Sequence, residues 1–280
     1  MNFINTIKEM QNLSTTWQLE GQHIGFVPTM GNLHAGHLSL VKKASEVCDK
    51  VVVSIFVNPL QFDDGQDFAR YPRTIEEDQE ELSAHKVDAV FVPDEQELYP
   101  LGKETTTKVE VPGISNILEG ASRAGHFVGV TTVVNKLFNI VQPHIAVFGE
   151  KDFQQLHIIR QMVSDLNIPV EIIGMPTARE VDGLAMSSRN NRLDSARREI
   201  APVLHQVLDE MREKILQGRA DVPVLKQSAL EQLSKAGFEP DYIELRDATN
   251  LQEPTDNTTE RVILAAARLG EIRLIDNLRV

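Results

Sequence analysis

The sequence predicts an α/β protein with a doubly wound, Rossmann-like parallel sheet in its N-terminal domain and a smaller α+β domain at its C-terminus. Between Gly21 and Gly174, short β-branched runs alternate with longer amphipathic stretches. Strands that are apolar throughout and separated by helices are typical of a parallel sheet covered on both faces. After Asn191 this alternation stops, and helices are followed by neighbouring strands. A chain of 280 residues is long enough for both domains.

The first region contains five β-branched, apolar runs that we interpret as strands. They are residues 24–29, 51–57, 87–92, 145–149 and 170–174. The helices expected between them lie near residues 37–46, 75–85, 130–140 and 153–166. Residues 99–122 interrupt this rhythm with proline, glycine and a run of threonines, so we interpret them as an excursion beside the sheet.

The second region predicts two helices and then three strands. The helices are expected at residues 195–217 and near residues 222–236, and the strands at residues 242–246, 262–267 and 272–275. The boundary between the regions is expected within residues 176–188. The sequence therefore predicts one domain over residues 1–176 and a second over residues 177–280.

Composition excludes several classes of protein. The longest apolar run, residues 51–57, is far too short to span a bilayer, and no basic segment leads into an apolar core near Met1. Because Cys48 is the single cysteine, an internal disulfide is impossible. We therefore expect a cytoplasmic protein with no membrane partner. The net charge of −13 argues against nucleic acid as a partner, whereas a small anion needs only a local cationic cluster.

Residues 28–37, Pro-Thr-Met-Gly-Asn-Leu-His-Ala-Gly-His, lie where the first predicted strand ends and a helix begins. The N-terminus of a helix offers N–H groups and partial positive charge to phosphate. Gly31 and Gly36 let the backbone approach a ligand closely. His34 and His37 are three residues apart and can share one face of the helix. By spacing alone, two surface histidines beside a glycine turn would explain the motif equally well.

Two more motifs offer cations for phosphate. Residues 148–155, Phe-Gly-Glu-Lys-Asp-Phe-Gln-Gln, follow the predicted strand 145–149, and open α/β sheets bind ligands at such carboxyl ends. Residues 183–190, Gly-Leu-Ala-Met-Ser-Ser-Arg-Asn, combine two hydroxyls with Arg189, whose guanidinium can grip two phosphate oxygens. Taken alone, each motif is explained better by a capped helix start.

Three polar residues are candidates for binding a hydroxylated acid. Asn58 and Gln61 follow the second predicted strand, and His126 precedes a helix. Ordinary turn chemistry around Pro59 and a structural histidine are the competing explanations. We interpret the acidic residues 76–81 as a solvated helix face, although carboxylates there could also lie near a magnesium ion.

These motifs resemble those of a known family. The His-x-Gly-His pattern is similar to that of the nucleotidyltransferase superfamily, which includes class I aminoacyl-tRNA synthetases. The longer string at residues 28–37, the Gly-Glu-Lys-Asp run and the Met-Ser-Ser-Arg-Asn run resemble the pantothenate synthetase family. Aminoacyl-tRNA synthetases carry a Lys-Met-Ser-Lys-Ser loop, whereas this chain has Ala185 and Arg189 at the lysine positions.

The resemblance implies an enzyme that uses ATP to join pantoate to β-alanine through a pantoyl adenylate, releasing AMP and pyrophosphate. It implies alignment and charge neutralisation by His34, His37, Lys151, Ser187, Ser188 and Arg189. It also implies ATP contacts from Met30, Gly149, Asp152, Ala178 and Met186, and pantoate contacts from Asn58, Gln61, His126 and Gln155. Mg²⁺ bound mainly by phosphate oxygens, with its protein ligands left open, and a homodimer are further implications. Because the Met-Ser-Ser-Arg run lies at the expected domain junction, we also expect the C-terminal domain to act as a lid.

Two other functions remain compatible with the motifs. A nucleotidyltransferase acting on a phosphorylated small molecule would share the two-histidine motif. Gln61 and Gln155 favour an uncharged hydroxylated acceptor over such a phosphate. A nucleotide-binding regulatory module without turnover is the second alternative, and the intact histidines, lysine and arginine argue against it.

Overall fold

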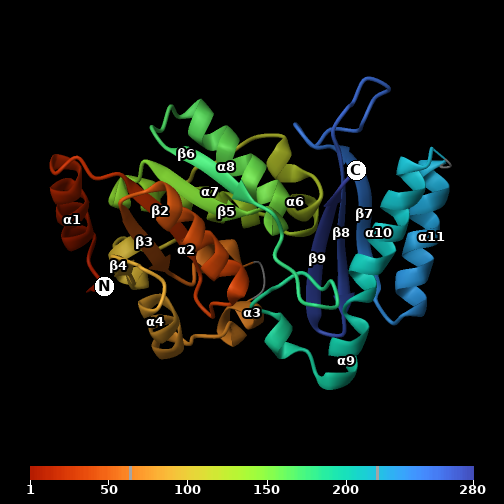
Figure 1. The fold of residues 1–280 in the computed structure, drawn as a ribbon, viewed down its shortest axis with the longest axis horizontal. Helices are drawn as coiled ribbons and strands as arrows, with labels where there is room; N and C mark the ends of the chain where they lie inside the picture. The colour runs from red at the N-terminus through yellow and green to blue at the C-terminus, as the bar shows by residue number, and fades with distance from the viewer. Residues whose placement is uncertain (63–64, 219–220) are drawn as a thin grey trace. The chain divides into compact units, whose positions relative to one another are not determined.

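The computed structural model describes residues 1–62, 65–218 and 221–280. The chain divides into two compact units. The first unit comprises residues 1–150 and 155–176, and the second comprises residues 151–154 and 177–280 (Figure 1). The short segment 151–154 therefore belongs with the C-terminal part of the chain, although its neighbours on both sides belong to the first unit.

A parallel sheet forms the centre of the first unit. Its described strands run in the order β1-β4-β3-β2-β5-β6. Their bounds are β1 Asn2–Ile4, β2 Ile24–Thr29, β3 Lys50–Ile55, β4 Ala89–Phe91, β5 Ile145–Gly149 and β6 Glu171–Met175. The predicted doubly wound sheet is confirmed, and the five predicted strands agree with β2 to β6 within two residues at each end.

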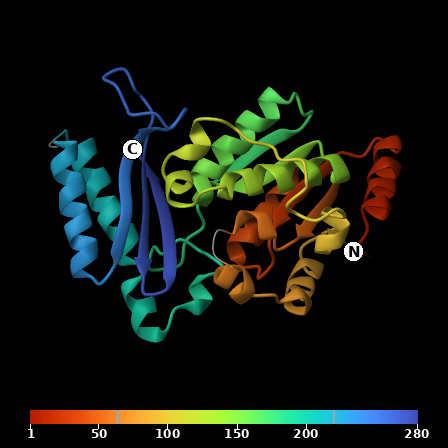
Figure 2. The ribbon, with the colours of Figure 1, turned by 180° about the vertical axis from the view of Figure 1, so that it is seen from behind.

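Alternation of side chains along β2 explains why helices cover both faces of this sheet. On one face, a side chain at Gly25 would contact Ala44 and Cys48, so the helix α2 (Ala35–Val47) lies close against that glycine. On the other face, the ring of Phe26 packs edge-on against Phe138 of α7 (His126–Val141). The two views of the ribbon show helices on both sides of the sheet (Figures 1 and 2).

Further helical elements complete the first unit, although the first two residues of the last one belong to the second unit. They are α1 (Ile7–Leu19), η1 (Pro59–Gln61), α3 (Gly65–Arg70), α4 (Ile75–Ser83), α5 (Glu95–Leu98), η2 (Ile114–Asn116), α6 (Glu119–Ser122) and α8 (Phe153–Asp165). The predicted excursion at residues 99–122 runs beside α7, because Thr131 Oγ1 donates to the Val109 carbonyl and the Val109 N–H donates to Thr132 Oγ1.

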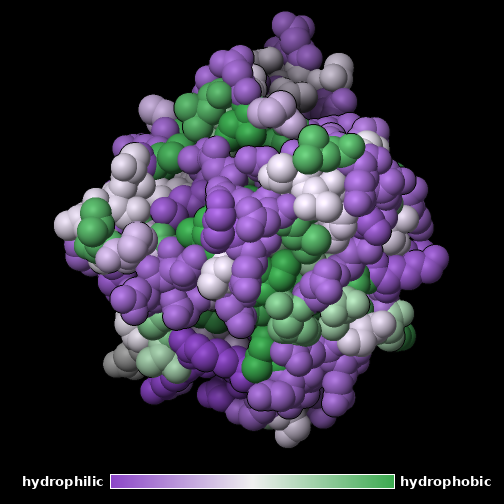
Figure 3. All heavy atoms as spheres, turned by 90° about the vertical axis from the view of Figure 1, so that its left-hand side faces the viewer, coloured by the Kyte–Doolittle hydropathy of each residue, from purple (hydrophilic) through white to green (hydrophobic). Residues whose placement is uncertain are grey.

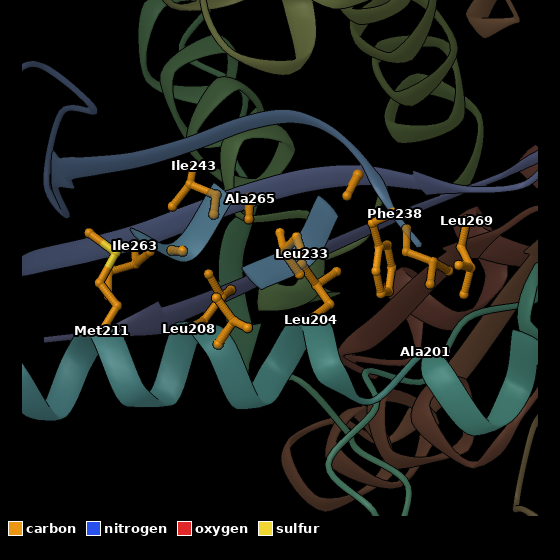
Figure 4. Packing of buried hydrophobic residues seen from close by; sticks show 14 of the residues in the cluster. Ala201, Leu204, Leu208, Met211, Leu233, Phe238, Ile243, Ile263, Ala265 and Leu269 are labelled. Atoms are coloured by element: carbon orange, nitrogen blue, oxygen red, sulfur yellow. The ribbon is translucent and has the colours of Figure 1, made fainter. Parts of the chain in front are cut away.

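The second unit packs helices on one antiparallel sheet. Its strands, in the order β7-β8-β9, are Glu239–Asp247, Arg261–Leu269 and Ile272–Arg279. Its helices are α9 (Ser195–Ile200), α10 (Val203–Leu216) and α11 (Val222–Lys235), and the short element η4 (Asn190–Arg192) precedes them. The turn η3 (Glu150–Asp152) starts at the last residue of the first unit before Lys151. Leu204, Leu208 and Met211 of α10 point toward the sheet and pack with Ile263 and Phe238 (Figure 4).

One predicted element is wrong, and one strand was missed. The helix expected over residues 195–217 is two helices, because α9 ends at Ile200 and α10 begins at Val203. Pro202 lies between them, and proline has no N–H for the hydrogen bond that would continue a helix. The strand β1 was not predicted, since it has three residues of which Ile4 alone is buried. No pattern of alternation can appear in so short a run.

Hydrophilic residues cover most of the face on the α1 side of the molecule, with hydrophobic residues gathered in a few patches between them (Figure 3). Across residues 1–62, 65–218 and 221–280, no helix is both long enough and apolar enough to span a bilayer.

Candidate functional site

The first two motifs leave the sheet from neighbouring strands. The chain proceeds outward from β2 through β3 to β4 on one side and from β5 to β6 on the other, so the strand order reverses between β2 and β5. The β2–β5 ladder pairs Gly25 and Phe26 only, whereas β2 stays paired with β3 as far as Thr29. Doubly wound sheets bind ligands at the carboxyl ends of the strands that flank such a reversal. The strands β2 and β5 therefore end where a doubly wound sheet is expected to bind a ligand.

The loop after β2 brings His34 and His37 together at the start of α2. Their ring centroids are 4.1 Å apart. His34 is the N-cap of α2, and its Nδ1 accepts a hydrogen bond from the Gly36 N–H at 3.1 Å. A neutral imidazole that accepts at Nδ1 carries its proton on Nε2. The other ring nitrogen of His34 is therefore a hydrogen-bond donor, which suits a phosphate oxygen.

The carboxylate of Asp78 binds the backbone of this loop. Asp78 was not selected from the sequence. Its carboxylate accepts hydrogen bonds from the Asn32 N–H at 2.9 Å and from the Leu33 N–H at 2.7 Å. Gly31 has φ +79°, and a side chain there would lie 2.9 Å from Asp78 Oδ2. The loop is thus shaped by a glycine conformation and one carboxylate acting together.

The interpretation of residues 76–81 as a solvated helix face is wrong for Asp78, which is 3% exposed. Burial raises the pKa of its carboxyl group, although the hydrogen bonds from Leu33, Asn32 and Thr74 act in the opposite direction. The available signal was spacing. Ile75, Asp78 and Leu82 are separated by three and four residues, which places Asp78 on the same face of α4 as two apolar residues.

The candidates for binding a hydroxylated acid form one cluster in the first unit. The Asn58 amide donates to Gln61 Oε1 at 3.1 Å, and Gln61 Nε2 donates to Met30 Sδ at 3.0 Å. His126 Nδ1 lies 2.8 Å from the Gln61 carbonyl oxygen. Arg123, which sequence reasoning did not select, donates to the same carbonyl at 3.2 Å. Side chains from three separate segments therefore meet around Gln61.

Asn58 is 1% exposed, and its side chain is fully occupied by the protein. Besides the bond to Gln61, its amide donates to the Gly129 carbonyl, and its oxygen accepts from Tyr99 Oη at 2.8 Å and from the Leu60 N–H. An amide side chain has two donor hydrogens and two acceptor positions, and all four are used. Asn58 is therefore suited to orienting Gln61 rather than to contacting a ligand directly.

Close packing fixes the position of this cluster. A side chain at Gly129 on α7 would overlap the carbonyl group of Leu60, so glycine alone fits there. Helix α7 and the turn η1 are therefore in backbone contact, and His126 in the first turn of α7 is held beside Gln61. Gln155 lies half-buried near the start of α8, also in the first unit.

The predicted phosphate ligands after β5 belong to the second unit. Lys151 Nζ lies 3.9 Å from Asp152 Oδ2, and the Lys151 carbonyl accepts a hydrogen bond from Asn277 Nδ2 at 3.0 Å. Gly149, two residues earlier, is the last residue of β5 in the first unit. The cation and its aspartate thus start a turn whose backbone is held by the strand β9.

The loop of Ser187, Ser188 and Arg189 extends from a small hairpin in the second unit. Arg179 pairs with Ala185 in an antiparallel bridge, and the Met186 N–H donates to the Ala178 carbonyl at 2.9 Å. Ser187 Oγ accepts from the Arg189 N–H at 3.3 Å. Ser188 is 8% exposed. Ala178 and Met186, both predicted to contact ATP, are therefore paired with each other beside the serines.

A buried ion pair supports this hairpin. Arg179 Nη1 and Nη2 donate to the two oxygens of Asp276 at 2.7 and 2.9 Å. His205 Nδ1 lies 3.6 Å from Asp276 Oδ2. Burial alone would raise the pKa of Asp276, but the His205 imidazole and the Arg179 guanidinium bring that pKa below its ordinary value. Neither Arg179 nor Asp276 was assigned a role from the sequence, because no local pattern shows that two charged residues so far apart in the chain form a pair.

Comparison with known proteins decides the family. The sequence model of the family described as pantoate-beta-alanine ligase matches residues 2–279. The chain belongs to this family. The predicted family and the predicted ligase class are therefore confirmed, and the comparisons do not support the alternative of a nucleotidyltransferase acting on a phosphorylated acceptor.

Individual relatives agree along the whole chain. The protein of Aliivibrio fischeri named pantothenate synthetase is 55% identical over 280 residues, covering 100% of this chain and 96% of the relative. A crystal structure of pantothenate synthetase from Thermus thermophilus aligns with a TM-score of 0.92 at 44% identity, covering 99% of both chains. A pantoate-beta-alanine ligase from Francisella tularensis, described as complexed with beta-gamma ATP and beta-alanine, aligns with a TM-score of 0.83 at 38% identity, covering 99% of this chain and 97% of that one.

Each unit carries groups that suit the phosphates of ATP. The first unit supplies two imidazoles and a helix N-terminus, and the second supplies Lys151 and Arg189. Among the described residues, no group of three or more His, Cys, Asp or Glu side chains is arranged to hold a metal ion. A magnesium ion that is bound mainly by phosphate oxygens would require no such group, since Mg²⁺ commonly keeps waters and substrate oxygens as ligands.

Proposed function

We propose that this chain condenses pantoate with β-alanine at the expense of ATP, through pantoyl adenylate, and releases AMP and pyrophosphate. The observation that carries the proposal is the arrangement at the switch point of the sheet. The two-histidine loop follows β2, the Gly-Glu-Lys-Asp run follows β5, and the cluster around Gln61 lies in the same unit as the histidines. Family membership supplies the identity of the two substrates joined.

The reaction needs no nucleophile from the protein. A carboxylate oxygen of pantoate attacks the α-phosphorus of ATP, the bond to the β-phosphate breaks, and pyrophosphate leaves. The amine of β-alanine then attacks the acyl carbon of the adenylate, loses a proton, and displaces AMP. The protein must align these groups and neutralise the negative charge that shifts toward pyrophosphate.

We assign the phosphates to ligands from both units. His34 and His37 donate hydrogen bonds to phosphate oxygens at the N-terminus of α2, and the thirteen-residue helix adds partial positive charge there. Lys151, Ser187, Ser188 and Arg189 supply a compact cation, two hydroxyls and a planar guanidinium. Met30, Gly149, Asp152, Ala178 and Met186 complete the ATP site. The acceptor position at Asp152 suits a ribose hydroxyl, because a carboxylate only accepts.

We assign pantoate to the cluster around Gln61, together with Gln155. The amides of Gln61 and Gln155 can hydrogen-bond hydroxyl groups of pantoate, and His126 lies beside Gln61. Asn58 acts by holding the Gln61 side chain, because its own hydrogen-bonding positions are occupied. Arg123, whose Nη1 lies 3.2 Å from His126 Nε2, adds a positive charge that suits a carboxylate.

Three further features belong to this proposal. Mg²⁺ would be held mainly by the phosphate oxygens of ATP, and it would supply charge neutralisation as pyrophosphate leaves. The second unit acts as a lid whose closure excludes water from the adenylate. The protein works as a cytoplasmic homodimer. Light scattering tests the dimer by mass, and solution X-ray scattering with and without ATP and pantoate tests closure, which identical profiles would contradict.

The decisive experiment is detection of pantoyl-AMP by mass spectrometry after incubation with ATP, Mg²⁺ and pantoate. We expect pyrophosphate release to depend on pantoate and pantothenate to form when β-alanine is added. Lys151→Ala or His37→Ala should lower the rate of adenylate formation by about 100-fold or more, the cost typical of losing one charge-stabilising group. Glu80→Gln, on the exposed side of α4, is the matched control. ATP binding without pantoate-dependent pyrophosphate would contradict the proposal.

A further inference from the structure

The second half of β9 carries two adjacent buried polar residues for which the sequence analysis predicted no role. Asp276 is 4% exposed and Asn277 is 6% exposed. Successive side chains of a strand point to opposite faces of the sheet. Asp276 shares its face with Ile272 and Leu274, which belong to the hydrophobic core of the second unit. Asn277 consequently points away from that core, and the two residues reach different partners.

On the core face, Asp276 holds the hairpin that leads to the two serines. The Arg179 guanidinium donates one hydrogen bond to each oxygen of Asp276, an arrangement called here the Arg179–Asp276 fork. It also donates to the Gly183 carbonyl at 3.0 Å and to the Asn277 carbonyl at 3.1 Å. One guanidinium therefore connects the start of the hairpin, its turn and the strand β9. Because Ala185 pairs with Arg179, the direction in which residues 186–189 leave the hairpin depends on this contact.

On the opposite face, Asn277 and Arg279 hold the segment that carries Lys151. Asn277 Nδ2 donates to the Lys151 carbonyl at 3.0 Å. Two residues further along the same face, the Arg279 guanidinium lies 5.1 Å from the centre of the Phe153 ring. These contacts explain why residues 151–154 cluster with the second unit, although β5 before them and most of α8 after them lie in the first.

We propose that Asp276 and Asn277 are positioning residues that hold two ATP-binding segments in a fixed relation to each other. Asp276 acts through Arg179 on the loop of Ser187, Ser188 and Arg189, and Asn277 acts directly on the backbone of Lys151. The proposal rests on the phosphate-binding roles proposed above for Lys151 and Arg189. The strand β9 thus fixes the positions of the two cations assigned to phosphate, Lys151 and Arg189, so that both approach the same triphosphate with a constant spacing.

The physical reason is the sensitivity of phosphoryl chemistry to alignment. A displacement of about 1 Å at a reacting group can lower the rate by about 100-fold. A lysine side chain is long and flexible, so its position depends on where its backbone is held. The Asn277 amide fixes that backbone, and the Arg179–Asp276 fork fixes the hairpin with two charge-assisted hydrogen bonds in one plane.

The test compares Asn277→Ala and Asn277→Leu with the wild-type protein, together with Arg179→Lys. Leucine is similar in shape to asparagine but cannot donate to the Lys151 carbonyl, and lysine keeps the charge of Arg179 without its fork. The control is Asp241→Asn, which breaks a 2.6 Å ion pair to Arg273 on the same sheet. For each protein we would measure pantoate-dependent pyrophosphate release, the KM values for ATP and pantoate, and Tm.

We expect both Asn277 variants and Arg179→Lys to lower kcat/KM for ATP by about 10- to 100-fold, with the KM for pantoate within about twofold of wild type. Asp241→Asn should leave both KM values unchanged. If Asn277→Leu had the same kcat/KM for ATP as the wild type, the role of Asn277 would be only to fill space, and the proposal would fail. If kcat/KM fell equally for ATP and for pantoate, and in proportion to the loss in Tm, general destabilisation would explain the variants and the proposal would also fail.

The Lys151→Ala variant separates this inference from the proposed function. If Lys151→Ala abolished pyrophosphate release while the Asn277 variants remained active, the positioning inference alone would fail. If Lys151→Ala itself kept full activity, the phosphate-binding role of Lys151 would fail, and the role of Asn277 with it.

Discussion

Asp78 in the first unit and Asp276 in the second are both almost completely buried, yet they hold their loops by different means. Asp78 accepts hydrogen bonds from two backbone N–H groups of the loop that contains His34. Asp276 accepts two hydrogen bonds from the guanidinium of Arg179, one at each carboxylate oxygen. Burial dominates for Asp78 and raises its pKa, whereas His205 and Arg179 outweigh the burial of Asp276 and lower its pKa.

The difference shows that a buried carboxylate can hold a loop in place with or without a countercharge. Backbone N–H groups carry only partial charge, so they orient a chain but compensate incompletely for lost hydration. A guanidinium compensates more fully, and it makes the pair a strong stability determinant, since removing one partner leaves the other charge buried. We therefore expect the anchor at Asp276 to matter more for folding and the anchor at Asp78 to matter more for the local shape of its loop.

The largest effect is expected for Asp276→Ala. Removing the carboxylate leaves the Arg179 guanidinium in a largely buried site, and we expect a loss of about 3–5 kcal/mol in the free energy of unfolding. Urea unfolding followed by circular dichroism would measure it. A loss below about 1 kcal/mol would contradict the idea that the ion pair is a stronger anchor than Asp78.

Gly31→Ala tests how much the contact between the loop and Asp78 contributes to stability. The new methyl group would lie 2.9 Å from Asp78 Oδ2 in a backbone with φ +79°, so we expect a loss of about 2–3 kcal/mol. Gly21→Ala is the matched control, since Gly21 has φ +74° with open space around it and should lose only about 1–2 kcal/mol. Equal losses at the two positions would show that the contact with Asp78 has no energetic weight.

Asp78→Asn should lower the free energy of unfolding by an intermediate amount, less than Asp276→Ala. Asparagine retains one carbonyl oxygen and loses the second acceptor, so one loop N–H loses its partner, at a cost of about 1–3 kcal/mol. We also expect weaker ATP binding, because the loop that carries His34 is less well held. Calorimetric titration with a non-hydrolysable ATP analogue would test this effect, and an unchanged affinity would limit Asp78 to a structural role.

The two aspartates should respond to pH with opposite signs. The raised pKa of Asp78 means that its contribution is fully present below the ordinary value of 3.8 and is lost as pH rises through the raised value. The lowered pKa of Asp276 means that its contribution is present above 3.8 and is lost as pH falls through the lowered value. Unfolding of each asparagine variant against wild type, measured from below to above the ordinary pKa of aspartate, should therefore give stability differences that change in opposite directions.

The smallest effect is expected for Asp182→Asn, which breaks the 2.6 Å pair between Asp182 and Arg198 beside the hairpin turn. Both side chains are about a third exposed or more, and solvent screens such pairs, so we expect a change of about 0–1 kcal/mol. Comparison of Tm with that of Asp276→Ala would show whether burial, rather than ion pairing as such, makes the hairpin anchor strong. A loss as large as that of Asp276→Ala would contradict this explanation.

Much of the fold could be predicted because its elements are regular. Five strands of the main sheet were located within two residues, since continuous β-branched runs such as residues 24–29 are long enough to recognise. Strand β1 was missed because three residues show no period. The single helix predicted over residues 195–217 is divided at Pro202, where a local rule against proline in a helix interior overrode an amphipathic pattern.

The candidate site was predicted only where residues form motifs. Asn58, Gln61 and His126 lie in one cluster, but the hydrogen-bonding positions of Asn58 are all occupied within the protein, and Tyr99 and Arg123 in the same cluster were not selected. Arg179 and Asp276 are 97 residues apart in the chain. No local pattern relates two charges at such a separation, so only the folded chain reveals that they form a pair.

Sequence by itself determined the alternation of strands and helices, the order of the motifs and the family, because each of these is written in neighbouring residues. Tertiary structure alone decided which carboxylates are buried and what they hold. Asp78 lies in a run of acidic residues and Asp276 lies within the strand β9, and nothing local distinguishes their roles. Burial and pairing depend on residues distant in the chain, and these two properties set the pKa of each aspartate and the loop that it supports.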